Sequence, residues 1–204
     1  MYEATGDDAY KEFVLTQLGR FKASAGTAEC LPEQDYLTYF FALGQTGNGD
    51  FKEKIDAVME SIEWKLELMP FITAYETKYK RKEHYNDIAV MFRKKQEFSG
   101  YDLVSLIETI DQMSEEIYEY YRELRDLFKV IIKEKMKNLP NSSEIMEVGY
   151  SILKACNMGV LQKEKYGDFG ELLWKTIVGI DSDTCAGLKE MVHAQHIILN
   201  KQEV

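Results

Sequence analysis

The stretch TGNGDF at residues 46–51 decides the expected fold, because this turn ends an aromatic-rich apolar run and opens the next helix. A matching stretch, TGDDAY, stands at residues 5–10, and looser copies lie at 83–85 and 159–166. Aromatic residues mark successive units at spacings of 41, 34, 36 and 45 residues: Tyr10, Phe51, Tyr85, Tyr121 and Tyr166. These spacings match the length of helical hairpins. The sequence therefore predicts an all-α array of helix pairs, whose chemistry would lie in the loops at one rim.

The composition is typical of one soluble helical domain that spans residues 1–204. Of the 204 residues, 45% are apolar and 12% are aromatic, which is enough for one core, and no boundary divides the chain. The three prolines, Pro32, Pro70 and Pro140, stand where helices could begin or end. Residues 2–10 resemble the end of one helix followed by the start of another. A truncated fragment of a longer protein is therefore the alternative to a complete single domain.

Charge and hydropathy argue against nucleic-acid and membrane partners. The net charge of -10 comes without the clustered lysine and arginine that phosphate binding requires. No stretch approaches the ~20 apolar residues of a membrane helix, and the first residues show no export signal. We therefore expect a cytoplasmic protein, although truncation would also have removed an export signal.

No metal site or cofactor is expected. The three cysteines are odd in number and lack metal-ligand spacing, so they are interpreted as free thiols. Glu190, His193 and His196 follow the Glu-x-x-His spacing of di-iron bundles, but such a centre needs a second copy of this motif. The favoured interpretation is an ordinary terminal helix with two histidines near its polar edge.

The apolar periodicity places helices along nearly the whole chain, and no run alternates for long enough to favour a strand. The expected helices cover residues 7–24, 33–44, 50–69, 70–80, 83–96, 100–113, 115–137, 143–157, 163–179 and 185–201.

Four segments carry a resemblance to a known family: MPFITAYE at 69–76, YNDIAVMF at 85–92, residues 103–121 and residues 142–159. These segments resemble the unsaturated glucuronyl and rhamnogalacturonyl hydrolases of glycoside hydrolase families 88 and 105. The likeness covers roughly two thirds of the chain and is strongest at residues 149–161. It implies an α/α toroid of helical hairpins, or an incomplete version of one.

The resemblance also implies a reaction and its residues. In the family, a carboxylic acid protonates the double bond of a 4,5-unsaturated uronic acid, water adds at C5, and the hemiketal opens to release the sugar. Glu63, seven residues before Pro70, stands where the family has its catalytic Asp. Asp35 lies near the position of the second carboxylate. The candidate substrate-binding residues are Trp64, which stands where the family has a Gly, and Tyr101, which stands where it has a Trp.

Each of these positions also has a structural interpretation. Glu63 could be an exposed helical residue beside a core Trp64, and Asp35 could complement the dipole of its helix. The family's Arg is absent before Tyr101, and only eight residues separate Phe92 from Tyr101, where the family has a long active-site loop. Because a full toroid of six hairpins is hard to fit into 204 residues, an incomplete ring of four or five hairpins is expected.

Two functional hypotheses follow. The first is a hydrolase that acts on the unsaturated oligosaccharide products of polysaccharide lyases, with Glu63 as acid and Asp35 assisting. The second is a non-catalytic helical-repeat module that binds a glycan or a protein partner. Self-association is an expectation under either hypothesis, since an incomplete ring would expose apolar hairpin faces.

Overall fold

The computed structural model is all-α throughout the part of the chain that it describes. That part consists of residues 2–10, 12–13, 16, 36–47, 49–137, 140–141, 144–179 and 186–201. The helices are α1 (Tyr2–Thr5), α3 (Tyr36–Thr46), α4 (Gly49–Ser61), α5 (Met69–Tyr79), α6 (Tyr85–Arg93), α7 (Gly100–Gln112), α8 (Tyr118–Lys137), α9 (Ile145–Asn157), α10 (Lys163–Val178) and α11 (Ala186–Lys201), with short 3-10 turns at Leu66–Leu68 and Glu115–Ile117. No strand occurs in these ranges. The predicted all-α class is confirmed.

The repeated glycine turn works by backbone conformation. Gly6 ends α1 with φ 73°, Gly47 ends α3 with φ 62°, and Gly159 follows α9 with φ 71°. Only glycine adopts this left-handed region without a steric penalty from Cβ. The Gly47 N–H donates to the Leu43 carbonyl at 2.8 Å, which closes the last turn of α3. The repeated glycine turns predicted from the sequence therefore end helices.

One expected helix is interrupted. Residues 50–69 were predicted as a single helix, but α4 ends at Ser61, residues 62–65 are not helical, and Lys65 is extended (φ -128°, ψ 152°). Pro70 occupies the first turn of α5, where its missing N–H costs no hydrogen bond. The chain therefore restarts as a separate helix at Met69. The predicted helix at 7–24 lies largely outside the described residues.

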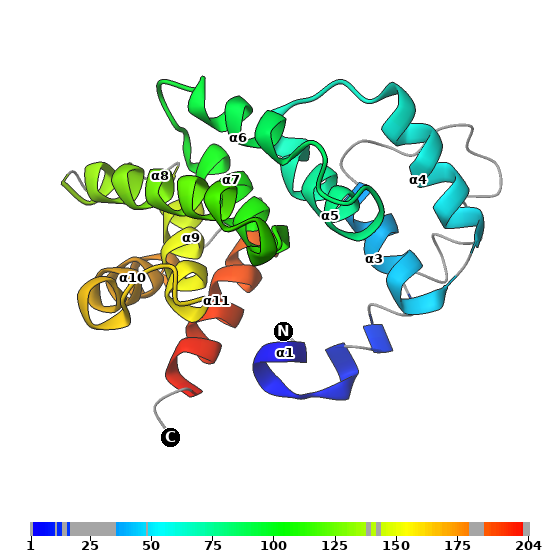
Figure 1. Cartoon of the computed structure of the whole chain (residues 1–204). Coiled ribbons are helices and arrows are strands. Elements are labelled where there is room, and N and C mark those ends of the chain that lie inside the picture. The colour runs from blue at the N-terminus through cyan, green and yellow to red at the C-terminus, as the bar shows by residue number, and fades with distance from the viewer. Residues whose placement is uncertain are drawn as a thin grey trace.

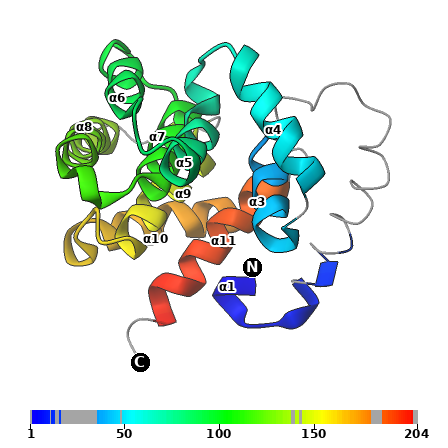
Figure 2. The ribbon, with the colours of Figure 1, turned by 45° about the vertical axis from the view of Figure 1, so that its right-hand side comes forward.

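The helices pack in an alternating order. Going along the chain, α5, α7, α9 and α11 each pack on the next of these helices, while α8 packs on α6 and α7, and α10 packs on α9. Figures 1 and 2 show α8 and α10 together on the left, and α4 at the opposite end beyond α3 and α5. In both views α1 lies beside α11, and these two helices are in contact. Closure into a toroid stays a prediction.

The core is centred on α9. Every residue from Ile145 to Cys156 is buried, because neighbouring helices cover it on several sides. The approach of α10 is close at Gly170, where an added Cβ would stand 2.8 Å from Leu153 Cδ2. None of the described helices has the length and apolar character needed to cross a membrane.

Candidate functional site

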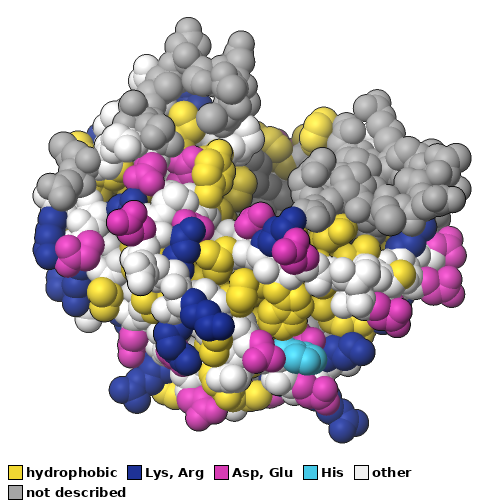
Figure 3. All heavy atoms as spheres, turned by 90° about the horizontal axis from the view of Figure 1, so that it is seen from above, with side chains coloured by type: hydrophobic (Ala, Val, Ile, Leu, Met, Phe, Trp, Pro, Cys, Tyr) yellow, Lys and Arg dark blue, Asp and Glu magenta, His cyan; other side chains and the backbone are white. Residues whose placement is uncertain are grey.

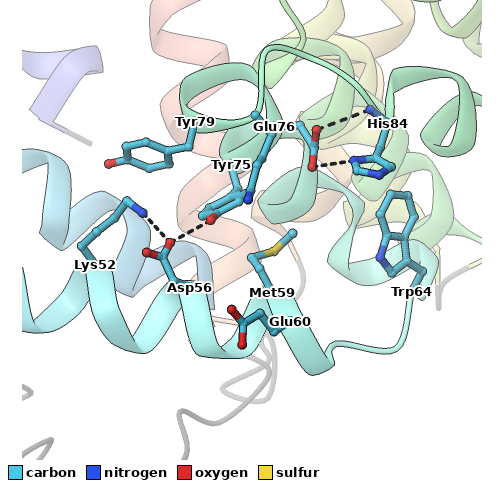
Figure 4. A pocket seen from close by; sticks show the side chains of 10 residues that line it. Lys52, Asp56, Met59, Glu60, Trp64, Tyr75, Glu76, Tyr79 and His84 are labelled. Atoms are coloured by element: carbon cyan, nitrogen blue, oxygen red, sulfur yellow. Dashed lines mark hydrogen bonds and ion pairs between the residues drawn. The ribbon is translucent and has the colours of Figure 1, made fainter.

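A cavity of about 490 Å³ lies between α4, α5 and the turn that follows α5. It is lined by Lys52, Asp56, Met59, Glu60, Trp64, Tyr75, Glu76, Tyr79, Lys80 and His84. Figure 4 shows two polar groups of side chains, with Asp56 and Lys52 on one side, Glu76 and His84 on the other, and Met59 between them. The surface seen in Figure 3 has acidic and basic side chains interspersed, so the net negative charge is not gathered into one patch on that face.

The first polar group centres on Asp56. The Tyr75 hydroxyl donates to Asp56 Oδ1 at 2.7 Å, and Lys52 Nζ pairs with the same oxygen from one turn earlier in α4. Burial by itself would raise the pKa of Asp56, but the hydrogen bonds from Lys52 and Tyr75 outweigh it and hold that pKa below its usual value. Burial and the Asp56 charge both raise the pKa of Tyr75. Near neutral pH, Asp56 is therefore an acceptor and Tyr75 a donor.

The second polar group is Glu76 with His84. Glu76 is only 2% exposed. Its Oε1 lies 2.9 Å from His84 Nδ1, and its Oε2 accepts the His84 backbone N–H at 3.4 Å. The His84 side chain is 46% exposed and lines the cavity. A buried carboxylate thus holds one nitrogen of a partly exposed imidazole.

The turn that returns His84 onto Glu76 is strained. Arg81 and Lys82 have φ of 55° and 66°, although neither is glycine. The left-handed conformation costs roughly 1–2 kcal/mol for each such residue. It is held in place by hydrogen bonds from the Lys80 and Lys82 N–H groups to the Glu76 carbonyl, at 3.2 and 3.1 Å. Strain of this kind is concentrated at functional sites, where the surrounding structure supports it.

Aromatic rings complete the walls. Trp64 meets the His84 ring edge to face, with centroids 5.9 Å apart and planes at 73°. Tyr75 and Tyr79 have centroids 5.3 Å apart, and Lys52 Nζ lies 4.4 Å from the centre of the Tyr79 ring. The break between α4 and α5 is what places Trp64 here, because the non-helical residues 62–65 pass along the end of the cavity.

The structure separates the residues that the sequence singled out. Trp64 lines the cavity, whereas the Glu63 side chain is 83% exposed, with Lys65 Nζ 3.8 Å from its carboxylate, and is not part of the lining. Tyr101 is 67% exposed near the start of α7, where its side chain hydrogen-bonds Glu147 of α9. Asp35 lies outside the described residues. The functional roles of these four residues stay predictions.

Sequence reasoning missed Asp56, Tyr75, Glu76 and His84. Glu76 follows a run of buried residues that begins at Met69, so the sequence pattern indicates only a buried helix at this position. Its partner is eight residues away, across a turn that depends on positive φ at Arg81 and Lys82. The signal present in the sequence was the histidine directly after the charged run at residues 78–83.

The histidines of α11 serve a packing role. His196 Nδ1 pairs with Glu171 of α10 at 2.7 Å, and its ring stacks on Trp174 with centroids 3.7 Å apart. His193 stacks on the same tryptophan at 6.1 Å. Within the described ranges no group of three or more metal-ligating side chains is found. Cys156 is buried, and its burial raises the pKa of the thiol to about 11.

Comparisons with protein-family models, curated protein sequences and solved structures found no match for this chain. The resemblance to unsaturated uronyl hydrolases therefore rests on the sequence segments alone, and the cavity must be interpreted from its own chemistry.

Proposed function

We propose that this protein binds an acidic oligosaccharide, with a terminal uronic acid, in the cavity that Trp64 lines between α4 and α5. The observation that supports this is the combination, in one cavity, of aromatic rings with fixed hydrogen-bonding groups. Ligand sites typically combine apolar and aromatic walls with a few placed polar groups. Trp64 and Tyr79 offer ring faces or edges for a sugar, while Asp56 and Glu60 offer acceptors for its hydroxyl groups.

The lysines of the cavity favour a negatively charged sugar. Lys52 is already paired with Asp56. Lys80 forms no ion pair with any described residue, and its ammonium lies 5.9 Å from the Tyr75 ring centre. The Lys80 ammonium, which also interacts electrostatically with Asp56, can attract an anionic group such as the carboxylate of a uronic acid. The charge of Lys80 thus agrees with the ligand class that the sequence resemblance implies.

Binding can be tested by tryptophan fluorescence, because the chain has two tryptophans in different places. Trp64 lines the cavity, whereas Trp174 stacks on His196 between α10 and α11. We expect an unsaturated uronyl disaccharide to change the fluorescence of the wild type and of Trp174→Phe saturably, and to leave that of Trp64→Phe unchanged. Calorimetry of the same variants measures affinity independently. An absence of heat and of fluorescence change with several uronides would refute the proposal.

A second candidate function is hydrolysis of the unsaturated uronyl group. The observation that favours it is the buried Glu76 paired with His84 in the same cavity, since such pairs are a common means of positioning a proton-transfer group. Turnover is followed as loss of the ultraviolet absorbance of the conjugated double bond, in the wild type and in Glu63→Gln and Asp35→Asn variants. Binding without turnover would favour the non-catalytic module.

A further inference from the structure

We propose that His84, oriented by Glu76, is the group that gives and takes the proton in this cavity. The inference rests on the proposed binding of an unsaturated uronide there. It assigns the catalytic proton transfer to an imidazole, in place of the carboxylate of Glu63 that the sequence resemblance implies.

Hydrogen bonding determines which nitrogen of His84 can react. An ionised carboxylate only accepts hydrogen bonds, so the contact of 2.9 Å between Glu76 Oε1 and His84 Nδ1 places a proton on Nδ1. Nε2 is then the nitrogen left for the ligand. The edge-to-face contact with Trp64 and the backbone bond from His84 N to Glu76 Oε2 restrict the ring further. Glu76 acts here as a positioning residue, since both of its oxygens are engaged by His84.

Two other carboxylates, Asp56 and Glu63, are poorer proton donors. Asp56 is held as an anion by Lys52 and Tyr75, which keep its pKa below the usual value even though burial alone would raise it. Glu63 points into solvent, with 83% of its side chain exposed, and does not line the cavity. An imidazole nitrogen can donate a proton and later take one back, which is why histidine is the side chain most often used as a general acid and base.

The reaction balances with His84 and one water. Protonated His84 transfers the Nε2 proton to C4 of the double bond, which forms a C4–H bond and leaves positive charge shared by C5 and the ring oxygen. A water oxygen then bonds to C5, and the proton that this water loses goes to Nε2. The net change is the addition of one water, and His84 returns to its starting state. The resulting hemiketal opens and releases the adjoining sugar.

The strained turn supports this assignment independently of the hydrogen bonds. Arg81 and Lys82 adopt left-handed conformations in the segment that carries His84 back over Glu76. A turn with glycine at these positions would avoid that cost. Retention of the strained geometry at the edge of a cavity is the expected pattern where a side chain must be held in one orientation.

The test compares turnover and binding in the full chain. For His84→Gln we expect kcat to fall at least about 100-fold, the usual contribution of a general acid or base, while the dissociation constant of the unsaturated disaccharide stays within about threefold. Glu76→Gln should likewise lower kcat and leave the dissociation constant nearly unchanged. His193→Gln is the matched control, because His193 lies on α11 and not in the cavity. Circular dichroism verifies that each variant is folded.

Chemical rescue separates catalysis from a structural role. Added imidazole should restore part of the turnover of His84→Gly, and should not affect that of Glu63→Gln. Full turnover in a folded His84→Gln, or its loss in Glu63→Gln alone, would overturn the assignment while leaving the binding proposal intact. Saturable binding with no turnover in the wild type would also overturn the assignment of His84 and leave the binding proposal intact. Absence of both binding and turnover would overturn the two proposals together.

Discussion

Lys154 of α9 offers a direct measure of how the stacked helices are held together. Only 9% of this residue is exposed, and its Nζ lies 2.7 Å from Glu108 and 2.9 Å from Asp111, both on α7. Tyr150 donates to the same Glu108. We expect Lys154→Met to weaken the contact between α7 and α9, because it removes the cation and leaves two carboxylates facing each other.

The size of the effect follows from exposure. Removing one partner of a fully buried ion pair costs roughly 3–5 kcal/mol. Here the side chains of Glu108 and Asp111 are 19% and 39% exposed, so water recovers part of that cost. We therefore expect a loss of about 2 kcal/mol in the free energy of unfolding. For a chain of this length, that loss corresponds to a Tm lower by roughly 4–8 °C.

Urea denaturation followed by circular dichroism measures this difference, with Lys137→Met as the control. Lys137 pairs with Glu134 at 2.6 Å, but both side chains are more than half exposed, so that pair should contribute less than about 1 kcal/mol. Equal losses in the two variants would refute the argument from burial.

The same variant should show a defined pH dependence. Burial by itself would lower the pKa of Lys154, but Glu108 and Asp111 outweigh it and raise that pKa above the usual 10.5. A raised pKa in the folded state means that the stabilisation is fully present below the unfolded pKa and is lost as the pH rises through the folded value. The difference between the wild type and Lys154→Met should therefore be constant near neutral pH and shrink above about pH 10.5.

Three further predictions concern the turns, a helix cap and the buried thiol. Gly47→Ala should lower the free energy of unfolding, measured by urea denaturation, by roughly 1–2 kcal/mol, because the φ of Gly47 is 62°. Gly49→Ala is the control and should be neutral or slightly stabilising, because Gly49 has no positive φ and an added Cβ would meet nothing within 4 Å. Burial alone would raise the pKa of Asp102, but hydrogen bonds from Ser99 and Lys95 outweigh it and lower that pKa. The stability lost in Asp102→Asn should therefore be about 1 kcal/mol at neutral pH, and it should shrink as the pH falls from about 4 through the lowered folded pKa. In a variant with Cys156 as its single cysteine, alkylation should be slow at pH 8 and become fast on unfolding, as mass spectrometry can measure, because burial raises the pKa of that thiol to about 11.

The helices could be predicted because their signals are local. Gly6 and Gly47 punctuate the chain by positive φ, and Ser99 with Asp102 forms a capping box at the start of α7, with hydrogen bonds of 3.2 and 2.8 Å. The apolar residues of α9 recur at helical spacing in the sequence, and all of them are buried in the structure. The break after Ser61 was missed, because nothing in the periodicity of residues 50–69 marks the extended Lys65.

The cavity could not be predicted, because its polar contacts join residues with no shared periodicity. Asp56 and Tyr75 are 19 residues apart on two helices, and they meet only after the chain reverses at residues 62–65. Glu76 and His84 meet only because two residues that are not glycine adopt left-handed conformations. Propensity argues against such a turn, so sequence reasoning assigns it no special role.

The left-handed backbone at Arg81 and Lys82 supports a functional role for this turn. Elsewhere in the described chain, positive φ falls on glycine, at Gly6, Gly47 and Gly159. Among the described residues, only Arg81 and Lys82 adopt positive φ without being glycine, and there the backbone brings an imidazole onto a carboxylate that is 2% exposed. A glycine at Arg81 would relieve part of this strain and also loosen His84, while it leaves the ion pair between Lys82 and Glu116 in place. We therefore expect Arg81→Gly to leave overall stability unchanged or higher while it lowers turnover, and a variant that gains stability with undiminished turnover would argue that the strain has no catalytic role.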